Sequence, residues 1–218
     1  MLGVVGRTGS GKTTLTRLIP RFYDPLSGVV RLGGVDLRAV RLAAVRGRIG
    51  LVTQEVRVFD ASVRDNLTIF DASVPDDQIR AALDTLGLIS WLWELPRGLD
   101  TPLGPGGVEL SAGQAQVLAC ARILLRDPDV VILDEPSSRL DPATERLVHT
   151  ALGQLLKGRT GVIVAHRLAT IAYVDDVLVL EDGQVREYGP RHTLAADPTS
   201  RFARLLQVAT ENTEAVTP

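Results

Sequence analysis

Residues 6–13 decide the fold of this chain, and they read Gly6-Arg7-Thr8-Gly9-Ser10-Gly11-Lys12-Thr13. The pattern matches the phosphate-binding loop G-x-x-x-x-G-K-S/T, in which glycines let consecutive backbone N–H groups converge on phosphate oxygens. The helix that follows such a loop presents its positive N-terminal end to the same phosphates. We therefore expect Lys12 to reach the β- and γ-phosphates of a nucleoside triphosphate, with ATP the expected one, and the Thr13 hydroxyl to ligate Mg²⁺.

The alternative interpretation of this stretch is a glycine-rich turn between a strand and a helix. A chance match in a chain of this size is roughly a one-in-a-hundred event, because glycine makes up about 7% of residues. Leu2 to Val5 have the pattern of a short buried strand, and residues from Thr14 to about Arg21 have that of a helix. This context favours nucleotide binding by the loop residues Gly6, Arg7, Thr8, Gly9, Ser10, Gly11, Lys12 and Thr13, together with Thr14.

Strand and helix patterns alternate along the rest of the chain. A hairpin is predicted over residues 29–37, with Gly33-Gly34 at its turn. Helical spacing of apolar residues extends from about Asp60 to Asp127, and further strands are predicted at residues 49–52, 130–133, 162–165 and 177–180. We predict an α/β fold with a P-loop NTPase core and a mostly parallel sheet, carrying a partial antiparallel β-subdomain and an inserted α-helical subdomain.

The length of 218 residues fits one domain, residues 1–218. Within it we expect a nucleotide-binding core with the partial β-subdomain over residues 1–58 and 128–190. The helical subdomain is predicted to span residues 59–127, and a C-terminal helix and tail residues 191–218.

The composition limits the possible partners and location of the chain. The formal net charge is −2, which argues against a nucleic-acid partner, because nucleic-acid binders usually carry a basic excess. The single cysteine, Cys120, cannot form a disulfide within the chain and fits a reducing compartment. Since no run of about 18 apolar residues occurs, we expect no bilayer-spanning segment. The chain is expected to reach a membrane only through a partner.

A second candidate site is the apolar run from Val130 to Leu133, which ends in Asp134 and Glu135. In an open α/β sheet the carboxyl ends of the strands face the ligand crevice. We therefore expect Asp134 to hold Mg²⁺, directly or through water, and Glu135 to polarise an attacking water. The alternative is that the two acids simply begin a solvated loop.

A third motif, Leu110-Ser111-Ala112-Gly113-Gln114, stands directly before a helical pattern. Ser111 is a natural helix N-cap, so by itself the pentapeptide indicates only the start of a helix. However, Ser111 lies 23 positions before Asp134. Together with the phosphate-binding loop, the set resembles the nucleotide-binding domain of ABC transporters, whose signature is L-S-G-G-Q.

Three further motifs follow the order found in that family. Gln54 resembles its Q-loop glutamine, Ser138-Arg139-Leu140-Asp141 its D-loop, and His166 its switch histidine. The resemblance implies that Glu135, His166 and Gln54 act in catalysis, and that Thr13, Gln54 and Asp134 surround the metal. It also implies contacts to nucleotide from Ser111, Ala112, Gly113, Gln114 and Asp141.

Within the family the chain is most similar to the exporter type, as judged from residues 22–25, 53–59, 62–67 and 95–101. The resemblance implies that two such domains pair head to tail and sandwich two ATP molecules, so that Ser111 of one meets the phosphate held by Lys12 of the other. It further implies transmembrane domains as partners, no nucleic acid, and a place on the cytoplasmic side of the cell membrane.

The chain departs from the family pattern at several places, among them Ala115, Val117 and Arg139. Ala112 replaces the first signature glycine, and residues 104–107 read G-P-G-G where exporters usually have G-E-R-G. The family also has a strand hairpin and an adenine-stacking aromatic residue before the loop, whereas five residues precede Gly6 here. We therefore expect the usual N-terminal portion to be missing, and the adenine-stacking residue is not identified.

Two other functions remain open on the sequence. One is a soluble ABC ATPase acting on DNA or ribosomes, although only 99 positions separate Lys12 from Ser111, which leaves no room for a long coiled coil. The other is a truncated nucleotide-binding fragment with little hydrolysis. The resemblance implies that membrane segments, and not the residues of this chain, choose the transported substrate.

Overall fold

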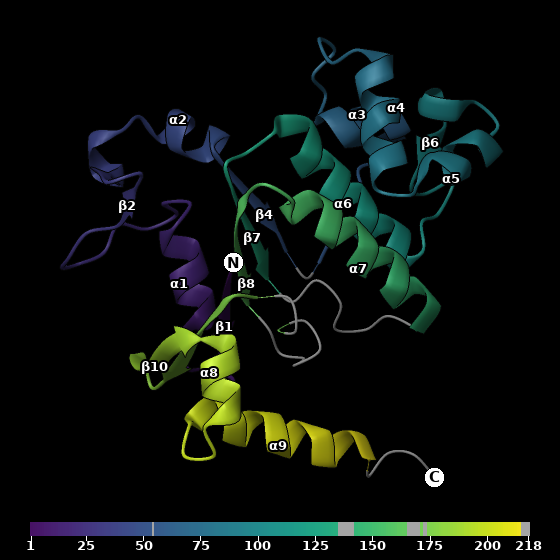
Figure 1. Ribbon diagram of the computed structural model, residues 1–218. Helices are drawn as coiled ribbons and strands as arrows, with labels where there is room; N and C mark the ends of the chain where they lie inside the picture. Colours follow the sequence, from purple (N-terminus) through teal and green to yellow (C-terminus); the bar gives the residue numbers. More distant parts are fainter. Residues whose placement is uncertain (54, 135–141, 165–170, 172–173, 215–218) are drawn as a thin grey trace. The chain divides into compact units, whose positions relative to one another are not determined.

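The central feature of the computed structural model is a six-stranded sheet with the strand order β10-β9-β1-β8-β7-β4 (Figure 1). The structure describes residues 1–53, 55–134, 142–164, 171 and 174–214. The strands are β1 (Leu2–Val5), β4 (Ile49–Val52), β7 (Val130–Asp134), β8 (Thr160–Val164), β9 (Asp176–Glu181) and β10 (Gln184–Pro190). β1 pairs in parallel with both β8 and β9, while β10 pairs antiparallel with β9. The predicted mostly parallel α/β sheet is thereby confirmed.

Buried apolar runs explain why these segments form inner strands. Val4 and Val5 of β1 are buried, as are all four apolar residues of β7, Val130 to Leu133. A strand whose consecutive side chains are all buried is covered on both faces, which is typical of a parallel sheet. Burying each such aliphatic side chain contributes about 1.5–3 kcal/mol. β7 was predicted from this same pattern, and it begins and ends within one residue of the prediction.

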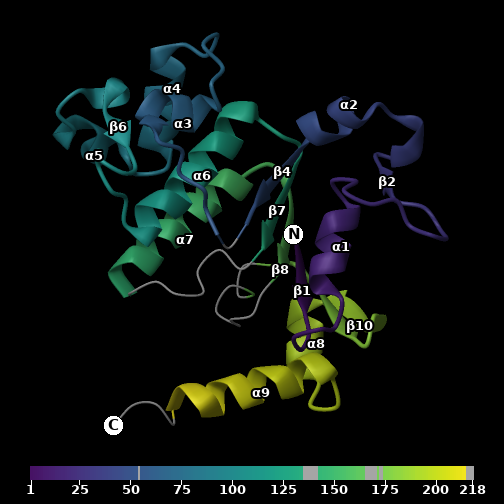
Figure 2. The ribbon, with the colours of Figure 1, turned by 180° about the vertical axis from the view of Figure 1, so that it is seen from behind.

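The chain groups into two compact units. The first comprises Met1–Arg46, Ile132–Glu135 and Gly161–Pro218. It contains α1 (Lys12–Leu18), the predicted hairpin as β2 (Arg31–Leu32) and β3 (Val35–Asp36), the short 3-10 helix η1 (Leu37–Ala39), α8 (Arg191–Ala196) and α9 (Arg201–Glu214). The sequence placed helix α1 at Thr14 to Arg21; it begins two residues earlier and ends at Leu18. α8 and α9 lie beside each other and against β10 in both views (Figure 1 and Figure 2).

The second unit comprises Gly47–Val131 and Pro136–Thr160 and is mainly helical. Its elements besides β4 and the start of β7 are β5 (Ala61–Ser62), α3 (Val63–Thr68), α4 (Asp76–Thr85), α5 (Ile89–Glu94), η2 (Gly98–Asp100), β6 (Pro102–Leu103), α6 (Ala112–Arg126) and α7 (Pro142–Leu156). Helix α2 (Leu42–Gly47) belongs to the first unit except for its last residue, Gly47, which is the first residue of the second unit. α6 and α7 lie side by side in both views (Figure 1 and Figure 2). The helical pattern predicted over residues 60–127 appears as α3 to α6, while the bounds of a helical subdomain stay a prediction.

No described helix is long and apolar enough to cross a membrane.

Close packing of β4 against α6 gives a prediction on stability. A Cβ atom added to Gly50 would lie 2.4 Å from Cγ2 of Ile123 and 3.1 Å from Cγ of Pro128. We expect Gly50→Ala to lower the free energy of unfolding by about 1–3 kcal/mol, because overpacking forces neighbouring groups to shift. Urea denaturation followed by circular dichroism measures this change.

Gly153→Ala is the matched control, because Gly153 is exposed in α7 and an added Cβ meets no atom within 4 Å. It should raise the free energy of unfolding by about 0.5–1 kcal/mol, since alanine is the better helix former. Equal effects of the two substitutions would contradict the packing argument.

Candidate functional site

The phosphate-binding loop follows β1 directly, and its first glycine lies against the backbone of another strand. Gly6 has a φ of 153°, and an added Cβ would lie 2.2 Å from the carbonyl oxygen of Leu180. The same atom would lie 2.6 Å from Oγ of Ser10. Only glycine allows this approach, so the loop can turn back over the end of β1.

Gly11, near the end of the loop, provides no side-chain cap for the backbone N–H groups at the start of α1. Gly11 is the N-cap residue of α1 and has a φ of 102°, in the left-handed region that favours glycine. Because glycine has no side chain, it offers no acceptor to the first N–H groups of the helix. These groups carry the positive end of the helix dipole and suit a phosphate.

Lys12 places a positive charge inside the loop rather than in solvent. Its side chain is only 4% exposed, and Nζ donates to the carbonyl oxygens of Gly6 at 2.8 Å and Arg7 at 3.0 Å. Burial of a lysine ammonium among carbonyl oxygens strengthens its attraction for an anion, since the local dielectric constant is lower than that of water. The predicted role of Lys12 therefore has a matching geometry.

Three polar side chains of the loop region, those of Ser10, Thr13 and Thr14, are consistent with a ligand there. Oγ of Ser10 is buried and has no hydrogen-bond partner among the described residues. Buried hydroxyl groups normally have a partner, so this oxygen fits a site that a ligand completes. Thr13 and Thr14 are exposed at the start of α1, with Thr13 held by a hydrogen bond from Oγ1 of Thr16 to its carbonyl oxygen at 3.0 Å.

The turn between β9 and β10 supports the phosphate-binding loop, and this contact was not predicted from the sequence. The backbone N–H of Gly183 donates to the carbonyl oxygen of Ser10 at 3.1 Å. Asp182 and Gly183 both have positive φ, 50° and 73°, as a tight hairpin turn requires. The signal was present, because Asp-Gly between two strand patterns is a strong hairpin indicator.

The predicted acidic pair lies at the end of β7. Asp134 is the last residue of that strand, in the same unit as the phosphate-binding loop, and β8 alone separates β7 from β1 in the sheet order. Asp134 is therefore two strands away in the sheet from β1, the strand that leads into the phosphate-binding loop. Glu135, Gln54, Asp141 and His166 lie outside the described residues, so their roles stay predictions.

The signature residues begin helix α6. Ser111 is its N-cap, and Oγ accepts a hydrogen bond from the backbone N–H of Gln114 at 3.2 Å. Oε1 of Gln114 in turn accepts from the backbone N–H of Ser111 at 2.9 Å. The helix-start interpretation of Ser111 is thus confirmed as a reciprocal capping box. Ser111 and Ala112 remain exposed, so the cap does not remove them from contact with a ligand.

Gly113 has a packing role as well. It is buried, and an added Cβ would lie 1.9 Å from Cγ2 of Thr144 on α7. The glycine therefore allows the first turn of α6 to approach α7 closely. By contrast, Ala112 is exposed, so alanine in place of the usual glycine is accommodated there.

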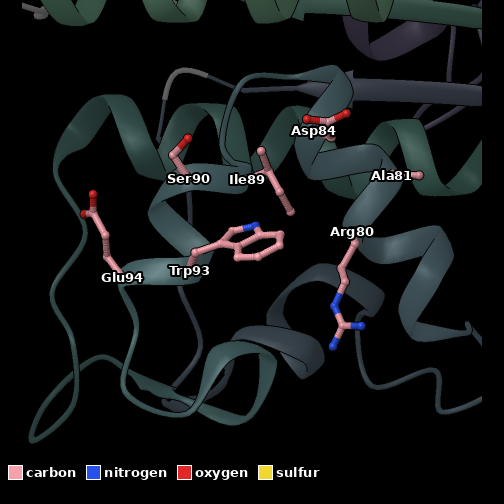
Figure 3. A pocket seen from close by; sticks show the side chains of 7 residues that line it. All are labelled: Arg80, Ala81, Asp84, Ile89, Ser90, Trp93 and Glu94. Carbon is pink, nitrogen blue, oxygen red and sulfur yellow. The ribbon is translucent and has the colours of Figure 1, made fainter.

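A shallow surface pocket of about 730 Å³, open to solvent, lies between α4 and α5 (Figure 3). Its lining residues are Arg80, Ala81, Asp84, Ile89, Ser90, Trp93 and Glu94. The indole of Trp93, 75% exposed, occupies the middle of this group in Figure 3, so Trp93 is not a core residue. None of the predicted nucleotide-binding residues lines this pocket.

Comparisons with known proteins agree with this geometry. The family model described as ABC transporter matches residues 1–138. The chain is 44% identical over 206 residues to an ATP-dependent lipid A-core flippase of Pseudomonas aeruginosa, covering 94% of this chain and 34% of the relative. It is 40% identical over 215 residues to ABC transporter B family member 21 of Arabidopsis thaliana, covering 98% of this chain and 17% of the relative.

The solved structure of a bacterial Atm1-family ABC exporter with ATP bound has the same fold. The TM-score is 0.84 at 32% identity, over 94% of this chain and 36% of that chain. The chain therefore spans only about a third or less of the length of these proteins. The predicted P-loop NTPase fold is confirmed by this likeness.

The capping box gives a prediction that separates two roles of Ser111. We expect Ser111→Ala to lower the free energy of unfolding by about 1 kcal/mol, because it removes the acceptor of the Gln114 N–H group. Ser111→Asp should leave stability within about 0.5 kcal/mol of the parent, since aspartate caps equally well. Chemical denaturation of the two variants measures both values, and equal losses would contradict the capping role.

Proposed function

Since this chain belongs to the ABC transporter family, whose model covers residues 1–138, we propose that it binds MgATP and hydrolyses it to drive an exporter. The observation that carries the proposal is the loop over residues 6–13, where a buried lysine ammonium and helix N–H groups converge. The exporter-type relatives support the choice of transport over a soluble function. The chain would be the nucleotide-binding part of a longer or multi-chain assembly.

Binding of the triphosphate follows from the charges at the loop. Nζ of Lys12 would exchange one or both of its carbonyl acceptors for β- and γ-phosphate oxygens, a stronger charge-assisted pairing. The N–H groups at the start of α1 would hold the same phosphates. The hydroxyl of Thr13 and the carboxylate of Asp134, with Gln54, supply oxygen atoms of the kind that Mg²⁺ prefers. Bound Mg²⁺ would neutralise charge that develops on the phosphates during transfer.

Hydrolysis needs a group that orients the attacking water. We assign this role to Glu135, the residue directly after Asp134, and we assign to His166 the positioning of Glu135 and of the water beside the γ-phosphate. Because both assignments rest on the resemblance of these positions to the family motifs, they are proposals for this chain.

A second copy or a related domain would complete the site. α6 is a 15-residue helix, and Ser111 with the N–H groups of Ala112 and Gly113 stands at its positive end. In a head-to-tail dimer this end would contact the γ-phosphate held by the partner domain, with Asp141 at the same interface. Such a shared site makes hydrolysis depend on dimerisation.

An exposed aromatic pair in the second unit supports docking to membrane domains. Phe59 and Phe70 are 38% and 58% exposed, and their ring centroids lie 5.5 Å apart in an edge-to-face arrangement. Neighbouring Ile69 is also exposed. Clustered apolar side chains on a surface mark interaction sites more often than single ones do. We propose that this patch contacts membrane domains, with the chain on their cytoplasmic side.

Lys12 provides the test of nucleotide binding. Lys12→Ala should weaken MgATP binding by at least about a hundredfold, because it removes the charge that pairs with the phosphates. Equilibrium binding of a fluorescent ATP analogue in the presence of Mg²⁺ measures the loss. Lys157→Ala is the matched control, since Lys157 is exposed on the surface. Unchanged affinity of Lys12→Ala would refute the proposed site.

Mixing two inactive variants tests the shared site. Lys12→Ala and Ser111→Asp should each lack ATPase activity, the second because a carboxylate repels the γ-phosphate while still capping α6. In their heterodimer one site keeps both Lys12 and Ser111. An equal mixture should therefore recover roughly a quarter of parental activity if dimers form at random and sites act independently. No recovery on mixing would show that Ser111 acts within its own chain.

A further inference from the structure

Arg122 on α6 makes a set of hydrogen bonds that the proposed function does not use. Its Nε donates to the carbonyl oxygen of Asn66 at 2.6 Å, and Nη1 donates to the carbonyl oxygen of Arg57 at 2.7 Å. Nη2 donates to Oδ1 of Asn66 at 2.9 Å. All three nitrogens of the guanidinium are therefore held, and two different parts of the chain hold them.

The environment of this cation is unusual because the three acceptors are neutral. Desolvation by burial lowers the pKa of Arg122, yet an arginine side chain keeps its charge in proteins. Phe59 compensates part of the desolvation, since the guanidinium carbon lies 5.4 Å from the centre of its ring. The position of the charge thus depends on the backbone of residues 57–66 and on the Phe59 ring.

Asn66 joins these parts into one hydrogen-bonded body. Its side chain is fully buried, and Oδ1 also accepts from the backbone N–H of Phe59 at 2.8 Å. Nδ2 donates to the carbonyl oxygens of Phe59 at 2.9 Å and Ser62 at 3.0 Å. The segment from Arg57 to Ser62, which begins three residues after Gln54, is therefore tied to the first turns of α3 and, through Arg122, to α6.

We propose that Arg122 is a positioning residue that couples the segment 57–62 to the phosphate-facing end of α6. Ser111 lies eleven residues before Arg122, roughly 16 Å along the helix axis at 1.5 Å per residue. A displacement of Phe59 by a docked partner would be passed through the guanidinium to α6 and along this rigid helix to Ser111. The inference deepens the proposed function and rests on it for its consequence in turnover.

The coupling depends on the hydrogen bonds of Arg122 rather than on the apolar contacts between α3 and α6, because hydrogen bonds are directional. α3 and α6 are also in contact, and both carry fully buried apolar residues such as Val63 and Leu118. Apolar contacts are non-directional and tolerate a small slide of one helix along another. Hydrogen bonds weaken steeply when their angle changes, so the three bonds of Arg122 fix the register of α6 against the segment 57–62.

Arg122→Lys is the test variant, because lysine keeps the charge but cannot hold three separate acceptors in one plane. Arg126→Lys, one turn further along the same helix, is the matched control. We expect turnover at saturating ATP to fall on the order of tenfold or more in Arg122→Lys, since small misplacements of a phosphate-contacting group are costly. Binding of MgATP to the single chain should change less than about twofold, because that site uses the loop of Lys12.

A distance measurement tests the coupling without nucleotide. Spin labels on cysteines introduced at the exposed residues Asp60 and Ala112 report the position of the α6 end relative to the segment 57–62. The native Cys120 does not interfere, because burial raises the pKa of its thiol to about 12 and keeps it unreactive. The distance distribution should be narrow in the parent and in Arg126→Lys, and at least about twice as wide in Arg122→Lys.

The outcomes separate the two proposals. An unchanged distance distribution in Arg122→Lys overturns the coupling, whatever the turnover. A widened distribution in a chain that does not bind MgATP would support the coupling and refute the nucleotide-binding function. If Arg122→Lys fails to fold, Arg122→Gln replaces it, because a shorter, uncharged side chain cannot reach the acceptors of both Asn66 and Arg57. A distribution as narrow as that of the parent in Arg122→Gln would then overturn the proposal.

Discussion

The close approach of Gly6 to the backbone of β9 is the constraint from which the rest of the candidate site follows. It allows the chain to reverse over the end of β1, so the carbonyl oxygens of Gly6 and Arg7 point at the ammonium of Lys12. A side chain at Gly6 would collide with the carbonyl oxygen of Leu180 and displace the carbonyl oxygens of Gly6 and Arg7 from Lys12. The buried charge of Lys12, the start of α1 and the hydrogen bond from Gly183 to Ser10 all lie within six residues of Gly6 along the loop.

Helix α6 has a structural and a proposed chemical role at its first turn, and a proposed positioning role near its other end. Ser111 caps the helix through Gln114, and Gly113 allows its first turn to approach α7. The same residues stand at the positive end of the helix, where a phosphate is stabilised. Near the other end, Arg122 binds the backbone of the segment that follows Gln54. A site built this way can respond to a partner only if both ends stay fixed to their neighbours.

Local patterns were sufficient to predict the strand–loop–helix unit, the β2–β3 hairpin, the fully buried strand β7 and the N-cap at Ser111. Each of these depends on residues close together in the sequence, so composition and spacing carry the information. The turn between β9 and β10 has an equally local signal, the dipeptide Asp182-Gly183 between two strand patterns. The family resemblance was confirmed by relatives up to 44% identical among those compared and by a solved exporter structure.

The sequence by itself determined the chemistry of the phosphate-binding loop and the class of fold, because glycine, lysine and hydroxyl residues act there through their own backbone and neighbours. Only the tertiary structure decided that the backbone of Leu180 requires glycine at Gly6, that Thr144 packs directly against Gly113, and that Arg122 holds Asn66 and Arg57. These contacts join residues 31 to 174 positions apart in the chain. Such distant pairs leave no local periodicity or motif, since packing chooses them only after the elements have formed.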